Sequence, residues 1–258
     1  MAECPSRHTG PAEATARNSP LALSHVLFRQ SWHDVVFLHW EADPYEVARL
    51  LPSGTYPDLF HGRTFVGLVF FAMRNLAFGH APPLPYVGAF TEVNVRLYSR
   101  DALGRRAVVF RSLDCDRLLP VLAARAGFGL PYRWSHASRR WHDNRLVYRS
   151  RGRRDGSRAG GSAWMEVGGK PARTRPMDDF LTQRWGLHES VRGRTYYLPN
   201  THPAWTFLDC ELLGWNASVV GAAGLAEPLD HPVSVLYAPG VPVRFGPPVR
   251  LPGRTDVP

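Results

Sequence analysis

The chain has 258 residues, of which 44% are hydrophobic and 12% aromatic, and its net charge of +9 comes from 30 arginines, one lysine (Lys170) and 22 acidic residues. This length suits one large β-rich domain or two small ones, and the longest apolar run, from Phe65 to Met73, is far shorter than the roughly 20 residues that a membrane helix needs. The three cysteines form no Cys-x-x-Cys pair and no apolar signal-peptide core is visible near residue 1, so we expect a cytoplasmic protein without disulfides, zinc knuckles or membrane contact.

The positive charge is concentrated in one part of the chain. Residues 100–175 hold 18 basic and 6 acidic residues, a net +12, so the remainder carries −3. Such a segment can bind nucleic acid or an anionic substrate. Because no recognised nucleic-acid-binding module accompanies it, we favour a solvated arginine-rich surface.

The two ends of the chain differ in composition from its middle. Residues 1–24 are rich in Pro, Ala, Ser and Thr without periodicity, which is typical of a disordered tail. Residues 247–258 are again proline-rich and predict a loose end. No internal repeat or long linker divides the remainder, so we predict a single folded domain over residues 25–246.

In chain order, short β-branched runs predict strands and capping signals predict a few short helices. One helix opens at Pro44 behind its N-cap Asp43, and two more are expected at 116–126 and 177–182. The alternating segment 89–99 is the clearest strand. Further strands are predicted at 35–40, 64–72, 107–113, after Tyr132, at 146–151 and 162–167 (a hairpin around Asp155-Gly156), and at 184–190, 195–198, 205–212 and 233–237.

Many strands and few short helices indicate a β-dominated α+β fold. With this number of strands, closing a curved antiparallel sheet into a barrel removes its exposed edges. We therefore expect a barrel-like sheet with an internal pocket.

The clearest strand also carries the most informative polar pattern. Side chains at i, i+2 and i+4 of a strand share one face, so Glu92, Asn94 and Arg96 form a row bounded by Phe90 and Tyr98. A water-exposed face would make this an ordinary two-faced strand. Inside a barrel, the carboxylate, amide and guanidinium could instead orient a small polar ligand. The bounding aromatic residues favour the interior.

A second stretch of candidate residues runs from Asp114 to Tyr132. Asp114 and Arg125 can contact a ligand, or they can be a helix cap and a surface charge, and the pattern alone favours the second interpretation. Tyr132 follows the rigid Pro131, and its phenol can donate a proton or simply pack.

The eleven histidines show no metal-binding spacing. His39-Trp40 ends one predicted strand and His202-Pro203-Ala204-Trp205 opens another, and each of these histidines fits a hydrogen-bonded structural role better than a ligand role. A Gly-x-Ser-x-Gly nucleophile, a phosphate-binding Gly-rich loop and a dinucleotide fingerprint are all missing from the sequence. We predict neither a metal nor an organic cofactor.

Seven short motifs follow one another along the chain. They are His39-Trp40, Leu50-Leu51-Pro52, Glu92-x-Asn94-x-Arg96, Phe110-x-Ser112-Leu113-Asp114, Leu130-Pro131-Tyr132, Phe180-Leu181-Thr182-x-Arg184-Trp185 and His202-Pro203-x-Trp205. In this order they resemble the YqjF-like family, which carries the domain of unknown function 2071, and the resemblance covers residues 28–245.

That family looks like a distant relative of acetoacetate decarboxylase, which implies a barrel-like cone around a pocket. The relative uses a Schiff-base lysine with a neighbouring lysine, and a glutamate and an arginine in the pocket. Glu92 falls where the pocket glutamate is expected, whereas Tyr132 follows the proline where the reactive lysine would stand. The position of the pocket arginine falls near Trp40-Glu41, so that residue is also missing. A Schiff base needs a primary amine, and Lys170 fits a solvated turn.

Three functions follow as hypotheses, all with a small molecule as the expected partner, and a homo-oligomer is left open. The first is a lyase or isomerase acting on a small carbonyl or carboxylate compound, with Glu92 as base, Tyr132 as acid and Arg96 or Arg125 as anion clamp. By analogy, barrels of this kind without the decarboxylase pattern carry out aldol, dehydration or cyclisation chemistry.

The second hypothesis is a non-catalytic binder whose pocket is lined by Trp40, Phe70 and Trp205. The remaining candidate ligand contacts are Asn94, His39 and Asp114. The third and least favoured is a nucleic-acid binder that uses the arginines of residues 133–158.

Overall fold

The structure is a computed structural model that describes residues 19, 22–85, 88–117, 131–152 and 159–252. Its helices in these segments are α1 (Pro44–Leu50), α3 (Pro176–Thr182) and α4 (Ser218–Ala222). Its strands are β1 (Phe28–Ala42), β2 (Thr55–Pro57), β3 (Thr64–Phe78), β4 (Phe90–Asp101), β5 (Arg106–Cys115), β6 (Tyr132–His142), β7 (Arg145–Gly152), β8 (Gly160–Pro171), β9 (Gly186–Val191), β10 (Arg194–Thr201), β11 (Leu208–Asn216), β12 (Ser234–Phe245) and β13 (Val249–Arg250).

Each strand expected from the sequence overlaps one of these strands. The predicted cap of α1 is confirmed, because the Asp43 carboxylate accepts hydrogen bonds from the backbone N–H groups of Tyr45 and Glu46, at 2.7 and 3.3 Å. The helix expected at 116–126 and the hairpin turn at Asp155-Gly156 lie largely outside the described residues. The short elements α4, β2 and β13 were not predicted.

Nine strands close into a barrel. Their hydrogen-bonded order is β5-β6-β7-β8-β11-β12-β1-β3-β4, and the β4–β5 pair completes the ring. The pairs are antiparallel except for β5–β6, which is parallel. This closure confirms the expected curved, mostly antiparallel barrel.

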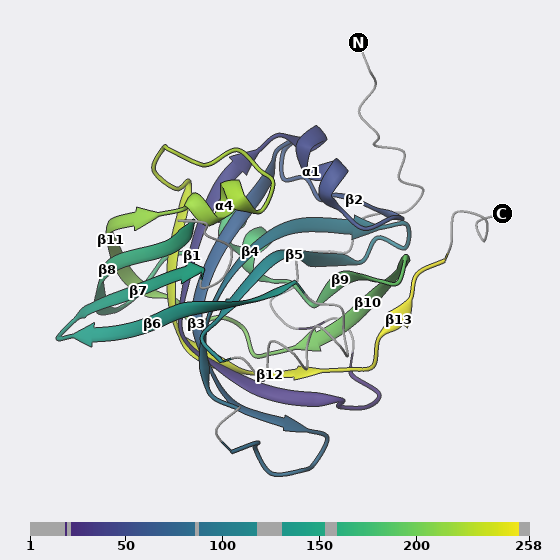
Figure 1. The fold of residues 1–258 in the computed structure, drawn as a ribbon, viewed down its shortest axis with the longest axis horizontal. Coiled ribbons are helices and arrows are strands. Elements are labelled where there is room, and N and C mark those ends of the chain that lie inside the picture. The colour runs from purple at the N-terminus through teal and green to yellow at the C-terminus, as the bar shows by residue number, and fades with distance from the viewer. Residues whose placement is uncertain (1–18, 20–21, 86–87, 118–130, 153–158, 253–258) are drawn as a thin grey trace.

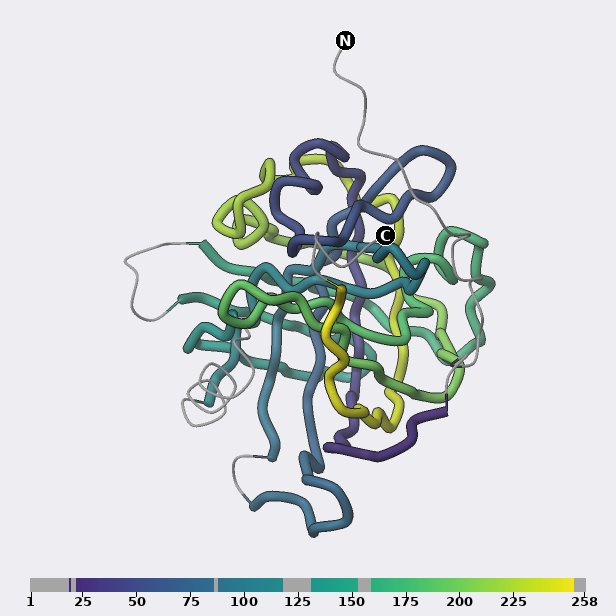
Figure 2. The backbone as a smooth tube through the Cα atoms, turned by 90° about the vertical axis from the view of Figure 1, so that its right-hand side faces the viewer, coloured from purple at the N-terminus to yellow at the C-terminus, as the bar shows by residue number. Residues whose placement is uncertain are grey.

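A second ring shares part of the same sheet. The pairs β5–β9, β9–β10 and β10–β12 close seven strands, β12-β1-β3-β4-β5-β9-β10, into a ring of their own. Five strands, β12, β1, β3, β4 and β5, therefore form a wall between two interiors. Figure 1 shows β6, β7, β8 and β11 on one side of β1 and β3, and β9 and β10 on the other. In the turned view of Figure 2, the connection between β3 and β4 projects beyond both rings.

The two faces of the shared wall line different interiors. Side chains on a strand alternate between faces, so Leu68 and Phe70 of β3 enter the nine-strand ring while Val69 and Phe71 enter the seven-strand ring. The nine-strand interior, which we call the packed compartment, is filled by buried apolar side chains that include Leu146, Met165 and Val219. The seven-strand interior encloses a cavity, and we call it the hollow compartment.

A bulge in β1 changes which residues face the cavity. Phe28, Gln30 and Trp32 line it from even-numbered positions, whereas Val35 and Phe37 do so from odd-numbered ones. The change of phase occurs between His33 and Val36, where the register with β3 shifts and Asp34 has a φ of 51°. An extra residue of this kind reverses the alternation beyond it.

Candidate functional site

The hollow compartment contains a cavity of about 90 Å³. Because about 10–15 Å³ of such space holds one water, this is room on the order of six to nine water-sized atoms. Aromatic and aliphatic side chains make up most of its lining. The polar side chains among the lining residues are Gln30, Glu92, Asn94, Arg96, Tyr132, Thr182, Arg184, Asn200 and His202.

Glu92 is the carboxyl group of this wall and is 2% exposed. Its Oε2 accepts a hydrogen bond from the Tyr132 hydroxyl at 2.8 Å, and its Oε1 accepts one from Asn94 Nδ2 at 3.3 Å. Burial raises the pKa of Glu92 from 4.5 to about 7, against the opposing effect of these two hydrogen bonds. Glu92 is therefore a carboxyl group poised to gain or lose a proton near neutral pH.

Tyr132 comes from the start of β6, beside the parallel pairing of β5 and β6. Burial, followed by the charge of Glu92, raises the pKa of the Tyr132 phenol well above its usual value of 10. The phenol thus keeps its proton and directs it to the Glu92 carboxyl group.

Arg96 places a positive charge on the same wall and is 7% exposed. It donates from Nε to the Tyr98 hydroxyl at 3.1 Å and from Nη2 to the Leu181 carbonyl at 3.0 Å. Its guanidinium also lies over the rings of Phe37 and Tyr98, at 5.2 and 5.4 Å. Within the described residues it forms no ion pair with a carboxylate, so a buried cation faces the cavity without an anion.

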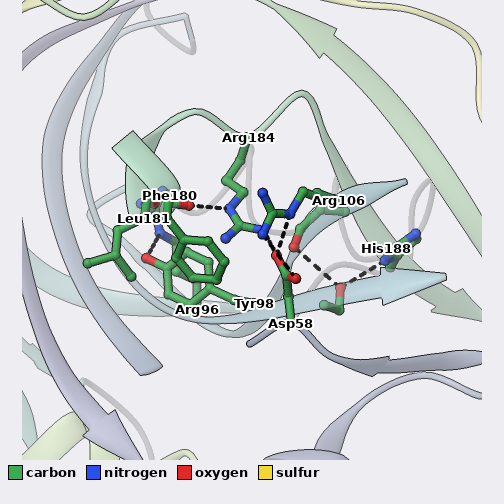
Figure 3. Close-up of polar contacts among 10 residues, drawn as sticks. Asp58, Arg96, Tyr98, Arg106, Phe180, Leu181, Arg184 and His188 are labelled. Carbon is green, nitrogen blue, oxygen red and sulfur yellow. Dashed lines mark hydrogen bonds and ion pairs between the residues drawn. The ribbon is translucent and has the colours of Figure 1, made fainter. Parts of the chain in front are cut away.

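Arg184 supplies a second guanidinium beside the first, as Figure 3 shows. It lies 4.8 Å from the Tyr98 ring and 4.3 Å from the Phe180 ring. Its Nη1 is 2.5 Å from Asp58 Oδ2, which Arg106 Nε also contacts at 2.9 Å. The other terminal nitrogen, Nη2, has no hydrogen-bond partner among the described residues.

These charges do not cancel. Arg106 and Arg184 both contact the Asp58 carboxylate, and Arg96 forms no ion pair with a carboxylate of the described residues. The nearby His188 contacts Ser99 Oγ at 2.8 Å, and burial lowers its pKa, so it adds no charge at neutral pH. The cavity therefore has a positively charged side that suits a small anion.

The structure brings five of the nine sequence-predicted site residues to the cavity: Glu92, Asn94, Arg96, Tyr132 and Trp205. Trp205 donates its indole N–H to the Thr182 carbonyl at 3.1 Å and packs edge-on against Phe37. It precedes β11 rather than opening it.

Two expected lining residues, one tryptophan and one phenylalanine, need correction. Trp40 and Phe70 do not line the cavity, because both point into the packed compartment. The Trp40 indole N–H donates to the Asp230 carbonyl at 2.8 Å. The bulge in β1 explains the error for Trp40, since Trp32 faces the cavity and Trp40, eight residues later, faces away from it. Phe70 faces away because it lies on the β3 face that lines the packed compartment.

His39 and Asp114 are also absent from the cavity lining. His39 is 0% exposed, and burial lowers its pKa well below 6.5. Asp114 is not a helix cap: it lies within β5, 0% exposed, where Ser150 Oγ donates to it at 3.0 Å and Arg133 Nε lies 3.6 Å away. Arg125 lies outside the described residues.

Sequence reasoning missed Gln30, Arg184, Asn200 and His202 as lining residues. The alternation of Leu198, Asn200 and His202 in and after β10 was the available signal, because side chains two apart share a face. Arg184 follows a helix by two residues, and no local pattern indicates which way it points.

Metal ligands and lysines do not gather at the cavity. No group of three or more His, Cys, Asp or Glu side chains able to hold a metal occurs in the part of the chain that the structure describes. Lys170 is exposed at the end of β8 and is not a lining residue. No helix within the described ranges is long and apolar enough to span a membrane.

Residues 29–242 match the model of the family DUF2071, described as an uncharacterized conserved protein. The chain belongs to this family. The DUF2071 chain is also 30% identical over 222 residues to the uncharacterized protein YqjF of Bacillus subtilis strain 168, covering 86% of this chain and 91% of the relative.

Solved structures share the fold at much lower identity. Acetoacetate decarboxylase from Legionella pneumophila aligns with a TM-score of 0.56 and 15% identity over 94% of the DUF2071 chain and 92% of its own. The enduracididine biosynthesis enzyme MppR, complexed with pyruvate, aligns with a TM-score of 0.56 and 16% identity over 90% and 92%. The fold is therefore acetoacetate-decarboxylase-like.

Proposed function

We propose that this protein is an enzyme that transfers protons on a small 2-oxo acid, with Glu92 as the acid–base group. The observation that carries the proposal is the Glu92 carboxyl group itself. It lies on the wall of a buried cavity, is held by Tyr132 and Asn94, and has a pKa of about 7. General acid–base catalysis works best when the pKa lies near the working pH.

The substrate class follows from charge and size. Arg96 and Arg184 line the cavity with two guanidiniums, and guanidiniums pair well with carboxylates. A cavity of about 90 Å³ fits a molecule of only a few non-hydrogen atoms. The fold relative MppR is complexed with pyruvate, which is a compound of this class.

A Schiff-base mechanism is not part of the proposal. It needs a primary amine, and Lys170, the one lysine of the chain, does not line the cavity. Tyr132 stands where a lysine would follow the proline, and its proton is directed to Glu92. We assign Tyr132 to holding Glu92 in place rather than to protonating the substrate, and the bond-making steps to direct proton transfer.

The test is hydrogen exchange at the carbon next to the carbonyl of pyruvate and 2-oxobutyrate. The protein is incubated with each acid in D₂O, and loss of the C3 proton signal is followed by NMR. Glu92→Gln should slow exchange by a factor of about 10²–10⁴, the usual contribution of a positioned acid or base. Pyruvate binding, measured by calorimetry, should persist because Arg96 and Arg184 remain.

A matched control is Glu189→Gln. Burial also raises the pKa of Glu189 to about 7, but Glu189 does not line the cavity, so this variant should exchange at the wild-type rate. Binding of either acid with no exchange above the buffer rate would make the protein a binder instead of an enzyme. If neither acid binds nor exchanges, the proposal is wrong.

A further inference from the structure

His202 lies on the cavity wall across from Glu92. It follows β10 directly, and Glu92 belongs to β4. In the seven-strand ring, β4 and β10 are separated by β5 and β9 on one side and by β3, β1 and β12 on the other. The two side chains therefore approach the cavity from opposing walls.

The protonation of His202 is fixed by its own chain. Nδ1 lies 2.7 Å from the Pro203 carbonyl oxygen, with which it forms a hydrogen bond. A carbonyl oxygen can only accept, so Nδ1 carries the hydrogen and Nε2 of the neutral ring holds a lone pair. No described residue donates a hydrogen bond to this Nε2.

The imidazole is also held in position. Its ring centroid lies 4.5 Å from that of Trp185 and 4.9 Å from that of Trp205, and Trp32 lies 6.5 Å away. These neighbours carry no charge, and the charged group that acts on His202 is Arg96. Burial, opposed by the Pro203 hydrogen bond and assisted by Arg96, lowers the pKa of His202 to about 4. The ring is thus a neutral base throughout the neutral range.

We propose that His202 is the second proton-transfer residue of the cavity and acts as the base that is paired with Glu92 as the acid. This inference rests on the proposed function and specifies its chemistry. Two titratable groups whose environments push their pKa values in opposite directions are the usual arrangement of an acid–base pair.

The proton transfers balance as follows. His202 Nε2 takes a proton from the carbon next to the carbonyl, and the C–H electron pair becomes the carbon–carbon double bond of an enol. The carbonyl π electrons move to oxygen and take the proton of the Glu92 carboxyl group. Glu92 is left as a carboxylate and His202 as an imidazolium, and the reverse transfers restore both. The substrate class is therefore an oxo acid with a hydrogen on the carbon beside its carbonyl.

The first experiment measures exchange of 2-oxobutyrate in D₂O for His202→Asn. The asparagine Nδ2 can still donate to the Pro203 carbonyl, but no basic nitrogen remains. We expect exchange to fall by a factor of about 10²–10⁴ while calorimetric binding of 2-oxobutyrate persists. Wild-type exchange in this variant would overturn the role of His202. If loss of exchange in Glu92→Gln accompanied it, the proposed function would still stand.

His231→Asn is the matched control. His231 also precedes a proline, its Nδ1 lies 3.0 Å from the Pro232 carbonyl, and its ring lies 5.3 Å from that of Trp215. It is exposed and does not line the cavity, so its variant should exchange at the wild-type rate. If His231→Asn lost as much exchange activity as His202→Asn, replacing a histidine before a proline would disturb the fold in general. That result would remove the support for His202 as the base.

The pH profile of the unmodified protein tests the same pairing without a variant. Around Glu92 the titratable neighbours are Tyr132 from β6 and Asp114 and Cys115 from β5. With Glu92 as acid and His202 as base, exchange should be constant between about pH 4 and pH 7 and should fall above pH 7. A rate that instead rises through pH 7 would make the Glu92 carboxylate the base and would overturn the proposal.

A third readout does not depend on activity. ¹⁵N NMR of histidine-labelled protein should show the His202 hydrogen on Nδ1, and pyruvate should shift the Nε2 resonance. A hydrogen on Nε2 would overturn the assignment. Absence of both binding and exchange in the wild-type protein would instead remove the proposed function on which this inference rests.

Discussion

The packed and hollow compartments use the two faces of one wall in opposite ways. On β4, Val93, Val95 and Leu97 enter the packed compartment, where they join its cluster of buried apolar side chains. Their neighbours Glu92, Asn94 and Arg96 enter the hollow compartment. Both sets are buried, so burial alone does not separate structural from functional residues in this protein.

The difference lies in how polar groups are satisfied. A buried polar group costs free energy unless it is hydrogen-bonded, and a densely packed apolar interior avoids this cost. The hollow compartment bears this free-energy cost. Its Arg96 has no carboxylate partner among the described residues, and burial raises the pKa of its Glu92 to about 7. We infer that the packed compartment contributes most of the free energy of unfolding, and that the buried polar groups of the hollow compartment lower it.

The largest expected effect comes from the one carboxylate that balances the arginines. Asp58→Asn removes the carboxylate that Arg184 and Arg106 both contact, and Arg184 is only 4% exposed. Removing one member of a buried ion pair typically costs about 3–5 kcal/mol, so urea unfolding should show a loss of that size. Glu166→Gln, which breaks a surface pair with Arg145, should cost less than about 1 kcal/mol. Equal losses of unfolding free energy in the two variants would contradict the distinction between the buried and the surface ion pair.

A leucine deleted from each compartment compares them directly. Leu68→Ala in the packed compartment should cost roughly 3–5 kcal/mol, because close neighbours on all sides lose contacts. Leu198→Ala at the cavity should cost about 2 kcal/mol or less, because part of its surface already faces empty space. Thermal and urea unfolding of the two variants measure the difference. A larger loss for Leu198→Ala would reverse our assignment of stability to the packed compartment.

The last expected effect has the opposite sign, because Glu92→Gln should stabilise the protein at alkaline pH. The folded-state pKa of Glu92 is about 7, above the ordinary 4.5. The contribution of protonated Glu92 to the free energy of unfolding is therefore complete below pH 4.5. It is lost as the pH rises through 7, by ~3 kcal/mol in total. Glu92→Gln removes this loss, so the variant should be the more stable protein at pH 8. The two proteins should converge near pH 4. A difference that does not change with pH would show that Glu92 ionises normally.

The sequence predicted the longer strands from local composition and alternation, and the Phe90 and Tyr98 that bound the Glu92 row indicated that the row faces the interior. It placed Trp40 and Phe70 in the cavity wrongly, because a bulge in β1 and the existence of a second ring are not visible in local patterns. The seven-strand ring closes through pairs such as Val108–Leu187 and Asn200–Phe245, which join distant segments. Arg184 reaches the cavity only through these closures, and the alternation of Asn200 and His202 shows that they share a face without showing which interior that face lines.

Sharing a wall constrains how this fold can vary. Inserting one residue into β3 before Leu68 would turn Leu68 and Phe70 from the packed compartment into the hollow one. The same insertion would turn Val69 and Phe71 from the hollow compartment into the packed one, so both linings would change together. Such an indel would place unmatched side chains on both sides of the partition at once. Descendants of this architecture are thus expected to diverge by point substitution along β1, β3 and β4, and to change length in the outlying connections, such as the one that joins β3 to β4.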